Sequence, residues 1–368
     1  MNIIIVCYPT FGGSGVLATE LGHNLAERGH SVHFIAYEKP VRLIDNNKSV
    51  FFHKVNVPYY PLFNFQPYEL ALSTKIVDVA TKNKINLIHV HYAIPHAYAA
   101  YMAQKMLKLN GFNLPIITTL HGTDITLVGK HPFYKDAVKF SIEKSNIVTS
   151  VSQSLKNDTH EFFETQKKII VIPNFVDTKK FDTQLLDCNN KDARKIITHV
   201  SNFRSVKNIR TLIKIFSIIS NEFDCIFNLI GEGPELEIAM SMSKELKIRN
   251  ISFSGNMTKV EKALCKSDIF ILPSKTESFG LSALEAMASK NAIISSSSGG
   301  LPELNINQKT GYTHKYNDID GFADSLRKLL LDEILLENLK ENSYNQAKKY
   351  NIDLVVPLYI EQYKKLCK

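Results

Sequence analysis

The sequence has no apolar run that approaches the roughly 18 consecutive residues of a membrane-spanning helix. The apolar stretch from Ile3 to Cys7 is also too short to be the hydrophobic region of a signal peptide. Both absences argue against a membrane-spanning or secreted protein. We therefore expect a cytoplasmic chain that is soluble, or at most peripheral to a membrane.

Cysteine is scarce, and its spacing is uninformative. The five cysteines are Cys7, Cys188, Cys225, Cys265 and Cys367. Their number is odd, and none forms a C-x-x-C pair or lies in a Cys/His cluster with the spacing of metal ligands. The pattern predicts free thiols in a reducing cytoplasm and gives no reason to expect a bound metal.

The sequence also lacks a dense run of Lys and Arg interleaved with aromatic residues, although basic residues are in excess. Lys and Arg number 44 against 36 Asp and Glu, so the net charge is +8 and the pI is near 9.0. This excess favours anionic partners, namely phosphates, carboxylates, acidic membranes or nucleic acid. Because the basic residues are spread along the chain, we expect no nucleic-acid partner.

The length of 368 residues is about twice that of a usual single domain, so we expect two hydrophobic cores. Short apolar runs alternate with segments of 3.6-residue periodicity, the pattern of a parallel sheet covered by helices. In the first half we predict strands at 2–7, 31–36, 87–90, 115–120 and 147–151, and helices at 15–28, 68–82, 95–109 and 134–144. In the second half we predict strands at 196–200, 226–230, 251–253, 269–272 and 292–295.

These patterns predict two doubly wound α/β domains. We place the first at residues 1–168 and the second at 169–350, because a polar stretch at 165–168 precedes the turn at Ile172-Pro173-Asn174. We expect a last helix, within residues 351–368, to pack back on the first domain.

A glycine-rich loop follows the first predicted strand and ends in Gly12-Gly13-Ser14-Gly15. Glycines there allow a close approach of the backbone, and the following helix N-terminus offers N–H groups to a phosphate or carboxylate. The segment also fits the G-x-G-x-x-A pattern of an NAD site, with Glu38 after the second strand. Five residues separate the first strand from Gly13, which argues against that site. A purely structural tight turn is the other alternative.

Histidines follow two strands of the first half. His121 follows strand 115–120, and His89, His91 and Tyr92 lie at the end of strand 87–90. The carboxyl edge of a parallel sheet is where α/β proteins bind ligands, which favours a functional His121 over a structural one. No carboxylate stands at ligand spacing from these histidines, so we predict no metal site.

In the second half, Arg204 and Lys207 lie between strand 196–200 and the next helix. A planar Arg fork and a Lys point charge together neutralise a diphosphate. A solvated helix start is the plainer interpretation.

An acidic pair surrounds another predicted helix start. The helix begins near Gly280, so Glu277 precedes it and Glu285 lies about one and a half turns inside it. An anion on the N–H groups of 279–281 would have a carboxylate on either side, each able to accept hydrogen bonds from hydroxyls. Hydroxyls on both sides of a diphosphate describe a nucleotide sugar, whereas a solvated helix face is the default explanation of two such glutamates.

Together these motifs resemble the GT-B retaining glycosyltransferases that carry an E-x7-E motif. The resemblance rests on Gly12–Gly15, His121, Ile172-Pro173-Asn174-Phe175-Val176-Asp177, Arg204 with Lys207, Glu277 to Glu285, and Ser298-Gly299-Gly300-Leu301-Pro302-Glu303. Within that group, the segments 12–15, 121–126 and 201–207 are most similar to the N-acetyl-α-D-glucosaminyl L-malate synthases of bacillithiol biosynthesis. The resemblance implies a GT-B architecture of two Rossmann-like domains with an interdomain cleft.

The resemblance further implies transfer of N-acetylglucosamine from UDP-N-acetylglucosamine to the hydroxyl of L-malate, with retention and without a metal or cofactor. It assigns catalysis to His121, Arg204, Lys207 and Glu277, donor binding to Gly13, Ser14, Phe279, Gly280, Leu281 and Glu285, and acceptor binding to Ser14, Tyr92, Thr119 and Arg204. In these roles Arg204 and Lys207 hold the diphosphate, Glu285 the ribose, and Glu277 the hexose. His121 contacts the donor sugar.

Retention by double displacement needs a nucleophilic carboxylate, and Asp124 is the nearest candidate in the first domain. We favour same-face attack, in which the departing phosphate takes the acceptor proton. Three alternatives remain: a lipid or glycan acceptor, an NAD-dependent oxidoreductase that uses Gly13 and Gly15, and a non-catalytic sugar-nucleotide binding module. A homodimer and a weak peripheral membrane contact through helix 95–109 also stay open.

Overall fold

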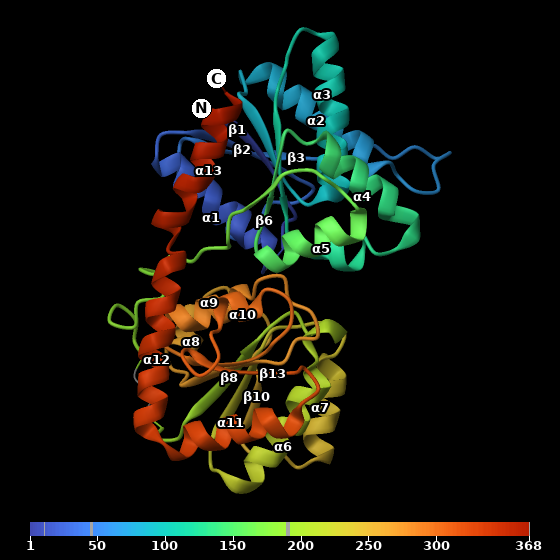
Figure 1. The fold of residues 1–368 in the computed structure, drawn as a ribbon. Helices are drawn as coiled ribbons and strands as arrows, with labels where there is room; N and C mark the ends of the chain where they lie inside the picture. Colours follow the sequence, from blue (N-terminus) through green and yellow to red (C-terminus); the bar gives the residue numbers. More distant parts are fainter. Residues whose placement is uncertain (11, 45–46, 189–191, 368) are drawn as a thin grey trace. The chain divides into compact units, whose positions relative to one another are not determined.

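The structure is a computed structural model that describes residues 1–10, 12–44, 47–188 and 192–367. Contacts within the chain divide it into two compact units (Figure 1). The first comprises Met1–Asn174 and Ile352–Lys368, and the second comprises Phe175–Asn351. Each unit is an α/β domain built on one parallel sheet.

The first unit has a seven-stranded sheet of order β3-β2-β1-β4-β5-β6-β7, in which every described pairing is parallel. Its strands are β1 (Asn2–Val6), β2 (Ser31–Ala36), β3 (Val50–Lys54), β4 (Leu87–His91), β5 (Ile116–Leu120), β6 (Ile147–Ser150) and β7 (Ile169–Val171). Its helices are α1 (Ser14–Glu27), α2 (Tyr68–Lys82), α3 (Tyr98–Leu109), α4 (Pro132–Lys144), α5 (Gln153–Phe163) and α13 (Ile352–Leu366). Two π-helical turns, η1 (Ala93–Ala97) and η2 (Thr123–Leu127), follow β4 and β5.

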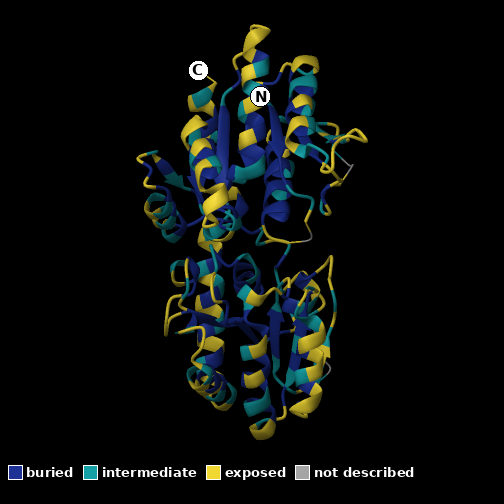
Figure 2. Ribbon diagram, turned by 90° about the vertical axis from the view of Figure 1, so that its right-hand side faces the viewer, coloured by how far each residue is buried: buried dark blue, intermediate teal, exposed yellow. Residues whose placement is uncertain are grey.

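The central strands of this sheet are nearly continuous apolar runs because their side chains are buried on both faces of the sheet. Ile3, Ile4, Ile5 and Val6 of β1 are completely inaccessible to solvent, and all five residues of β4 and of β5 are buried. Helices cover both faces of the sheet, so no face of a central strand alternates toward solvent. Figure 2 shows the same pattern as dark blue strands flanked by helices with exposed outer faces.

The second unit has a six-stranded parallel sheet of order β10-β9-β8-β11-β12-β13. Its strands are β8 (Ile196–Val200), β9 (Ile226–Ile230), β10 (Ile251–Phe253), β11 (Ile269–Leu272), β12 (Ala292–Ser296) and β13 (Gly311–His314). Its helices are α6 (Ile209–Glu222), α7 (Leu236–Glu245), α8 (Glu261–Leu264), α9 (Leu281–Ala288), α10 (Leu301–Leu304), α11 (Ile319–Leu331) and α12 (Glu333–Ala347), with 3-10 turns η3 (Ser205–Lys207) and η4 (Lys348–Tyr350). In its core, Phe216 of α6 stacks on Phe227 of β9 with ring centroids 4.3 Å apart.

Two doubly wound parallel domains were predicted, and the structure confirms them; the amino-terminal part of the first unit ends at Asn174, within the predicted boundary region of 164–176 but six residues after the chosen position, 168. The short strand β7 pairs with β6 in the first sheet, and the first unit extends to Asn174. The three apolar residues of β7 could equally be the last strand of the first sheet or the first strand of the second. The sequence therefore did not predict that β7 pairs with β6. Strands β3 and β13 were not predicted; both lie at a sheet edge and mix polar residues with apolar ones, as in Val50–Lys54 and Gly311–His314.

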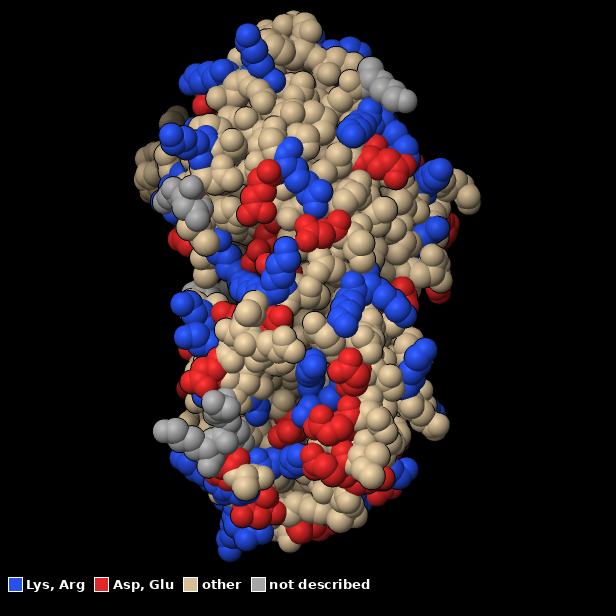
Figure 3. All heavy atoms as spheres, turned by 90° about the vertical axis from the view of Figure 1, so that its left-hand side faces the viewer, with Lys and Arg blue, Asp and Glu red and all other residues tan. Residues whose placement is uncertain are grey.

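The surface mixes charges of both signs. On the face drawn in Figure 3, basic and acidic side chains of the described residues are interspersed instead of forming a continuous basic stripe. Among the described residues, every helix is too short or too polar to span a bilayer.

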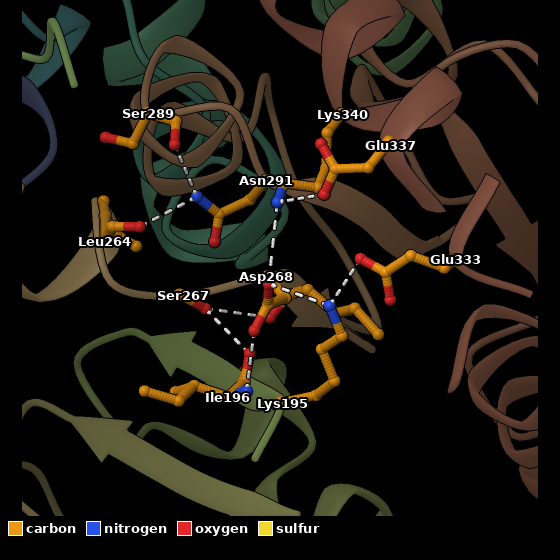
Figure 4. A network of polar contacts seen from close by, with 11 residues as sticks. Lys195, Ile196, Leu264, Ser267, Asp268, Ser289, Asn291, Glu333, Glu337 and Lys340 are labelled. Atoms are coloured by element: carbon orange, nitrogen blue, oxygen red, sulfur yellow. Dashed lines mark hydrogen bonds and ion pairs between the residues drawn. The ribbon is translucent and has the colours of Figure 1, made fainter. Parts of the chain in front are cut away.

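A polar network fastens α12 to the amino-terminal edge of the second sheet (Figure 4). Asp268, just before β11, accepts a hydrogen bond from the backbone N–H of Ile196 at 3.0 Å. Its other oxygen lies 3.5 Å from Lys340 Nζ of α12 and 3.8 Å from Lys195 Nζ, which also contacts Glu333 at 2.7 Å. These contacts hold the edge opposite to the carboxyl ends of the strands, where the candidate site residues lie.

Candidate functional site

Two cations follow β8 in the second unit, on a turn that is fixed from several sides. Arg204 is exposed, and η3 begins just after it. The turn ends at Asn208, whose left-handed backbone (φ 58°) suits asparagine better than most residues. The Asn208 side-chain amide donates to the carbonyls of Pro273 (3.1 Å) and Tyr316 (2.8 Å). The turn is therefore attached to the loop that follows β11.

That attachment brings Lys207 to Glu277. Lys207 Nζ lies 2.5 Å from Glu277 Oε2, and only 18% and 15% of the two side chains are exposed. Ser274 Oγ donates to the same carboxylate oxygen at 3.4 Å. Because β8 and β11 are neighbours in the sheet, a cation after one strand and a carboxylate after the other meet at its carboxyl edge.

The backbone of Glu277 is held as firmly as its side chain. Gly300 N donates to the Glu277 carbonyl at 2.9 Å. Gly299 has a positive φ of 60°, and a Cβ added there would lie 2.0 Å from the Glu277 carbonyl oxygen. Only glycine fits this close approach, which gives the predicted Ser298–Glu303 motif a structural reason.

Helix α9 begins at Leu281, directly after Gly280, and no side chain caps its N-terminus. Its first N–H groups have no partner within the helix and carry the positive end of the helix dipole. The ring of Phe279 is buried against Tyr350, with centroids 5.5 Å apart. Glu285 lies in the second turn and is 8% exposed. The second unit thus places Arg204, Lys207, Glu277, residues 279–281 and Glu285 at one edge of its sheet.

The first unit brings together residues from three loops at the carboxyl edge of its own sheet. Ser14, the first residue of α1, donates from Oγ to Tyr92 Oη at 2.8 Å. The Tyr92 ring lies 5.2 Å from the ring of His121 and 5.2 Å from that of Tyr8. Gly13 precedes α1 with a positive φ of 62°. The sequence motifs at 12–15, 92 and 121 therefore form one cluster, to which the structure adds Tyr8.

His121 is a partly buried, neutral imidazole. Its Nε2 lies 2.8 Å from His91 Nδ1, and burial, with His96 nearby, lowers the pKa of His121 to about 3. Asp124 fixes its backbone: Oδ1 accepts from the N–H of His121 (3.3 Å) and of Gly122 (2.9 Å). The other oxygen of Asp124 accepts from Ala93 N at 2.9 Å, and burial raises the pKa of this carboxyl.

Thr119, at the end of β5, lies inside the sheet. Its side chain is fully buried, and Oγ1 lies 2.8 Å from His89 Nε2 and 2.7 Å from Thr149 Oγ1. His89 Nδ1 in turn lies 2.8 Å from the hydroxyl of Tyr363 in α13. The role of Thr119 in acceptor binding stays a prediction. Its hydroxyl is buried because strand β5 is covered on both faces.

Within the described residues, no cluster of three or more His, Cys, Asp or Glu side chains has the arrangement of a metal site. His89, His91 and His121 do lie close together, with adjacent rings 4.5 Å and 5.0 Å apart. The described hydrogen bonds of their rings are to hydroxyls or to one another.

Comparison with known proteins identifies the family. Residues 11–180 match the model of Glycosyltransferase Family 4, and residues 186–346 match that of Glycosyl transferases group 1. The N-acetyl-alpha-D-glucosaminyl L-malate synthase of Bacillus anthracis is 41% identical over 362 residues, which cover 96% of this chain and 94% of that protein. The chain belongs to the GT-B glycosyltransferases. This membership leaves the predicted alternative of an NAD-dependent oxidoreductase without support.

Solved structures agree with the fold. A glycosyltransferase from Rickettsia africae superposes with a TM-score of 0.81 at 22% identity, covering all of this chain and 98% of that one. Anabaena HepE in complex with UDP-glucose gives a TM-score of 0.81 at 16% identity, covering 99% of this chain and all of that one. At these identities the likeness establishes the fold alone.

Several supporting contacts in the two clusters were not anticipated from sequence. Asn208 and Gly299 support the acidic pair and the cations through backbone contacts, and His91 supports His121. Gly299 and His91 were noted as part of a motif and at a strand end, whereas no signal pointed to Asn208. The contact between Lys207 and Glu277 depends on β8 lying beside β11, and the sequence does not give strand order.

Proposed function

We propose that this glycosyltransferase transfers N-acetylglucosamine from UDP-N-acetylglucosamine to the hydroxyl of L-malate, with retention, as the first step of bacillithiol biosynthesis. The observation that carries the proposal is the 41% identity, over nearly the full length of both chains, with a protein named for that product. The excess of basic residues suits both an anionic donor and a dicarboxylate acceptor.

The donor is proposed to bind at the carboxyl edge of the second sheet. Arg204 and Lys207 would neutralise the diphosphate, with help from the uncapped N-terminus of α9. Glu285 would accept hydrogen bonds from the ribose and Glu277 from the hexose. The 2.5 Å contact between Lys207 and Glu277 supports these roles, because a phosphate and the sugar bonded to it are adjacent groups that need adjacent partners.

The acceptor is proposed to contact Ser14 and Tyr92 of the first unit, and Arg204, whereas Gly13 and His121 are proposed to contact the donor. Thr119 stays a proposed acceptor contact, although its hydroxyl is buried and bonded within the unit. His121 is neutral and partly exposed, so it suits a polar contact with the donor sugar better than an ionic one.

Same-face attack is the mechanism that the first unit favours. A double displacement needs a free carboxylate beside the anomeric carbon, yet both oxygens of Asp124 accept backbone hydrogen bonds and its side chain is 1% exposed. In the proposed path the acceptor oxygen bonds to the anomeric carbon while the bond to the β-phosphate breaks, and the leaving phosphate takes the acceptor proton. Arg204, Lys207 and the α9 N-terminus would stabilise the growing negative charge.

An assay of UDP release tests the proposal. The purified chain is incubated with UDP-N-acetylglucosamine and with L-malate, glycerate or a lipid extract, and the anomeric configuration of the product is read by NMR. We expect release that depends on malate and an α-linked product. Release that only the lipid extract supports would instead select the lipid-acceptor alternative, and an inverted product would exclude retention.

A further inference from the structure

A pair of histidines lies at the carboxyl edge of the first sheet. His91 ends β4, and His121 follows the neighbouring strand β5. His91 Nδ1 and His121 Nε2 lie 2.8 Å apart, and the rings stack at 5.0 Å with an interplanar angle of 25°. His91 is 2% exposed, whereas His121 is partly open to solvent.

Only one of the two nitrogens that face each other can carry a proton. Burial lowers the pKa of His121 to about 3 and that of His91 well below its usual value, so both rings are neutral at physiological pH. Each neutral ring holds a single proton, and one ring must donate to the other. If His91 donates from Nδ1, the proton of His121 resides on Nδ1. If His121 donates from Nε2, the proton of His91 resides on Nε2.

The second arrangement leaves a buried donor with nothing to bind. Among the described residues, His91 Nε2 has no hydrogen-bond partner. An N–H group there would be buried and unpaired, and such orphaned donors are rare in proteins because desolvation is not compensated. In the first arrangement His91 Nε2 carries no proton and is an unpaired acceptor, which costs less than an unpaired donor. The hydrogen-bond pattern therefore favours the arrangement in which His91 donates to His121.

We propose that His91 is a positioning residue that holds His121 as the Nδ1–H tautomer, so that His121 presents a hydrogen-bond donor to its ligand. The hydrogen bonds of His121 in the described part of the chain involve its Nε2 and its backbone N–H, not Nδ1. The ligand group that fits a neutral N–H donor is an oxygen acceptor, such as a sugar hydroxyl or carbonyl. In this tautomer Nε2, the only basic nitrogen of the ring, is occupied by His91, so His121 does not act as a general base. The consequence for catalysis rests on the proposed function, whereas the tautomer itself does not.

The tautomer is measured by NMR on the full-length protein without substrate. All 12 histidines are labelled with ¹⁵N, and the His121 signals are those that disappear in His121→Gln. At pH 7 we expect Nδ1 of His121 to show the shift of a protonated nitrogen and Nε2 that of an unprotonated one. The opposite pattern would overturn the inference outright.

Two substitutions separate positioning from packing. His91→Phe keeps a planar buried ring but removes the donor, and His91→Asn places an amide N–H near the position of Nδ1. We expect the phenylalanine variant to lose the fixed tautomer of His121 and to lower kcat about five- to tenfold, the equivalent of one hydrogen bond, while affinity for UDP is unchanged. The asparagine variant should restore both properties in part.

His33→Phe is the matched control. His33 is also buried, and its Nδ1 also bonds a second histidine, His53, at 3.0 Å, but it lies on β2 away from this cluster. The control should leave the His121 signals and kcat unchanged. If His91→Phe also leaves both unchanged, His91 does not position His121. If His91→Phe does not fold, the wild-type tautomer and the asparagine variant decide the question. If no donor and acceptor pair is turned over, the proposed function fails and the NMR result still tests the tautomer.

Discussion

At the scale of residues, the two glutamates of the second unit are expected to have separable roles. Glu285→Ala should weaken UDP binding about ten- to a hundredfold, because hydrogen bonds to a charged group contribute about 1.5–3 kcal/mol. Glu277→Ala should leave UDP affinity nearly unchanged and lower kcat, because its proposed partner is the hexose. Calorimetric titration with UDP and steady-state turnover measure the two effects. Unchanged UDP affinity in Glu285→Ala would refute the ribose role.

The sequence was sufficient to place Arg204, Lys207 and Glu277 after strands and Glu285 in the helix that follows, but not to predict their contacts. Their roles toward the donor come from the resemblance and stay predictions. That Lys207 contacts Glu277 follows from strand order, which depends on long-range pairing and leaves no local signal. The inward orientation of Thr119 was also not predictable, because a threonine in a strand buried on both faces looks the same as one at its end.

At the scale of elements, Asp268 is expected to be the main polar contact between α12 and the second sheet. Asp268→Ala removes the acceptor of Ile196 N–H and the partner shared by Lys195 and Lys340. We expect the free energy of unfolding of the second unit to fall by about 1–3 kcal/mol, because the substitution leaves the partly buried N–H of Ile196 unpaired. Hydrogen exchange of β8 and β11 in urea-titrated full-length protein measures the change.

The matched control is Glu337→Ala, which removes another carboxylate that contacts Lys340. Glu337 lies 2.7 Å from Lys340 Nζ but is 56% exposed, and its loss should cost at most about 0.5 kcal/mol because solvent screens such pairs. Equal effects of the two substitutions would show that the Asp268 contact to Ile196 contributes nothing. The central strands were predicted well because they are buried and apolar, whereas β3 and β13 combine apolar residues with polar ones.

At the scale of the whole molecule, the two units differ in how many histidines they bury. Of the described chain, the buried histidines are His33, His89, His91 and His96 in the first unit and His199 in the second. The boundary between the units was difficult to place from sequence, because β7 lies between two breaks, the polar stretch at 165–168 and the turn at Ile172-Pro173-Asn174. Because the first unit buries more histidines than the second, the two units should respond differently to acid.

Acidification should therefore destabilise the first unit before the second. Burial lowers the pKa of His89 to about 3 and that of His96 to about 4, whereas an unfolded histidine titrates near 6.5. Between these pH values the unfolded chain binds more protons than the folded one. The free energy of unfolding is therefore undiminished by these histidines above about pH 6.5, and it decreases as the pH falls below that value. His199, with a pKa of about 4, is the single buried histidine of the second unit among the described residues. Hydrogen exchange at pH 7 and pH 5, corrected for intrinsic rates, should show a larger loss of protection in β4 and β5 than in β8 and β11. Equal losses would mean that the buried histidines do not set the acid response.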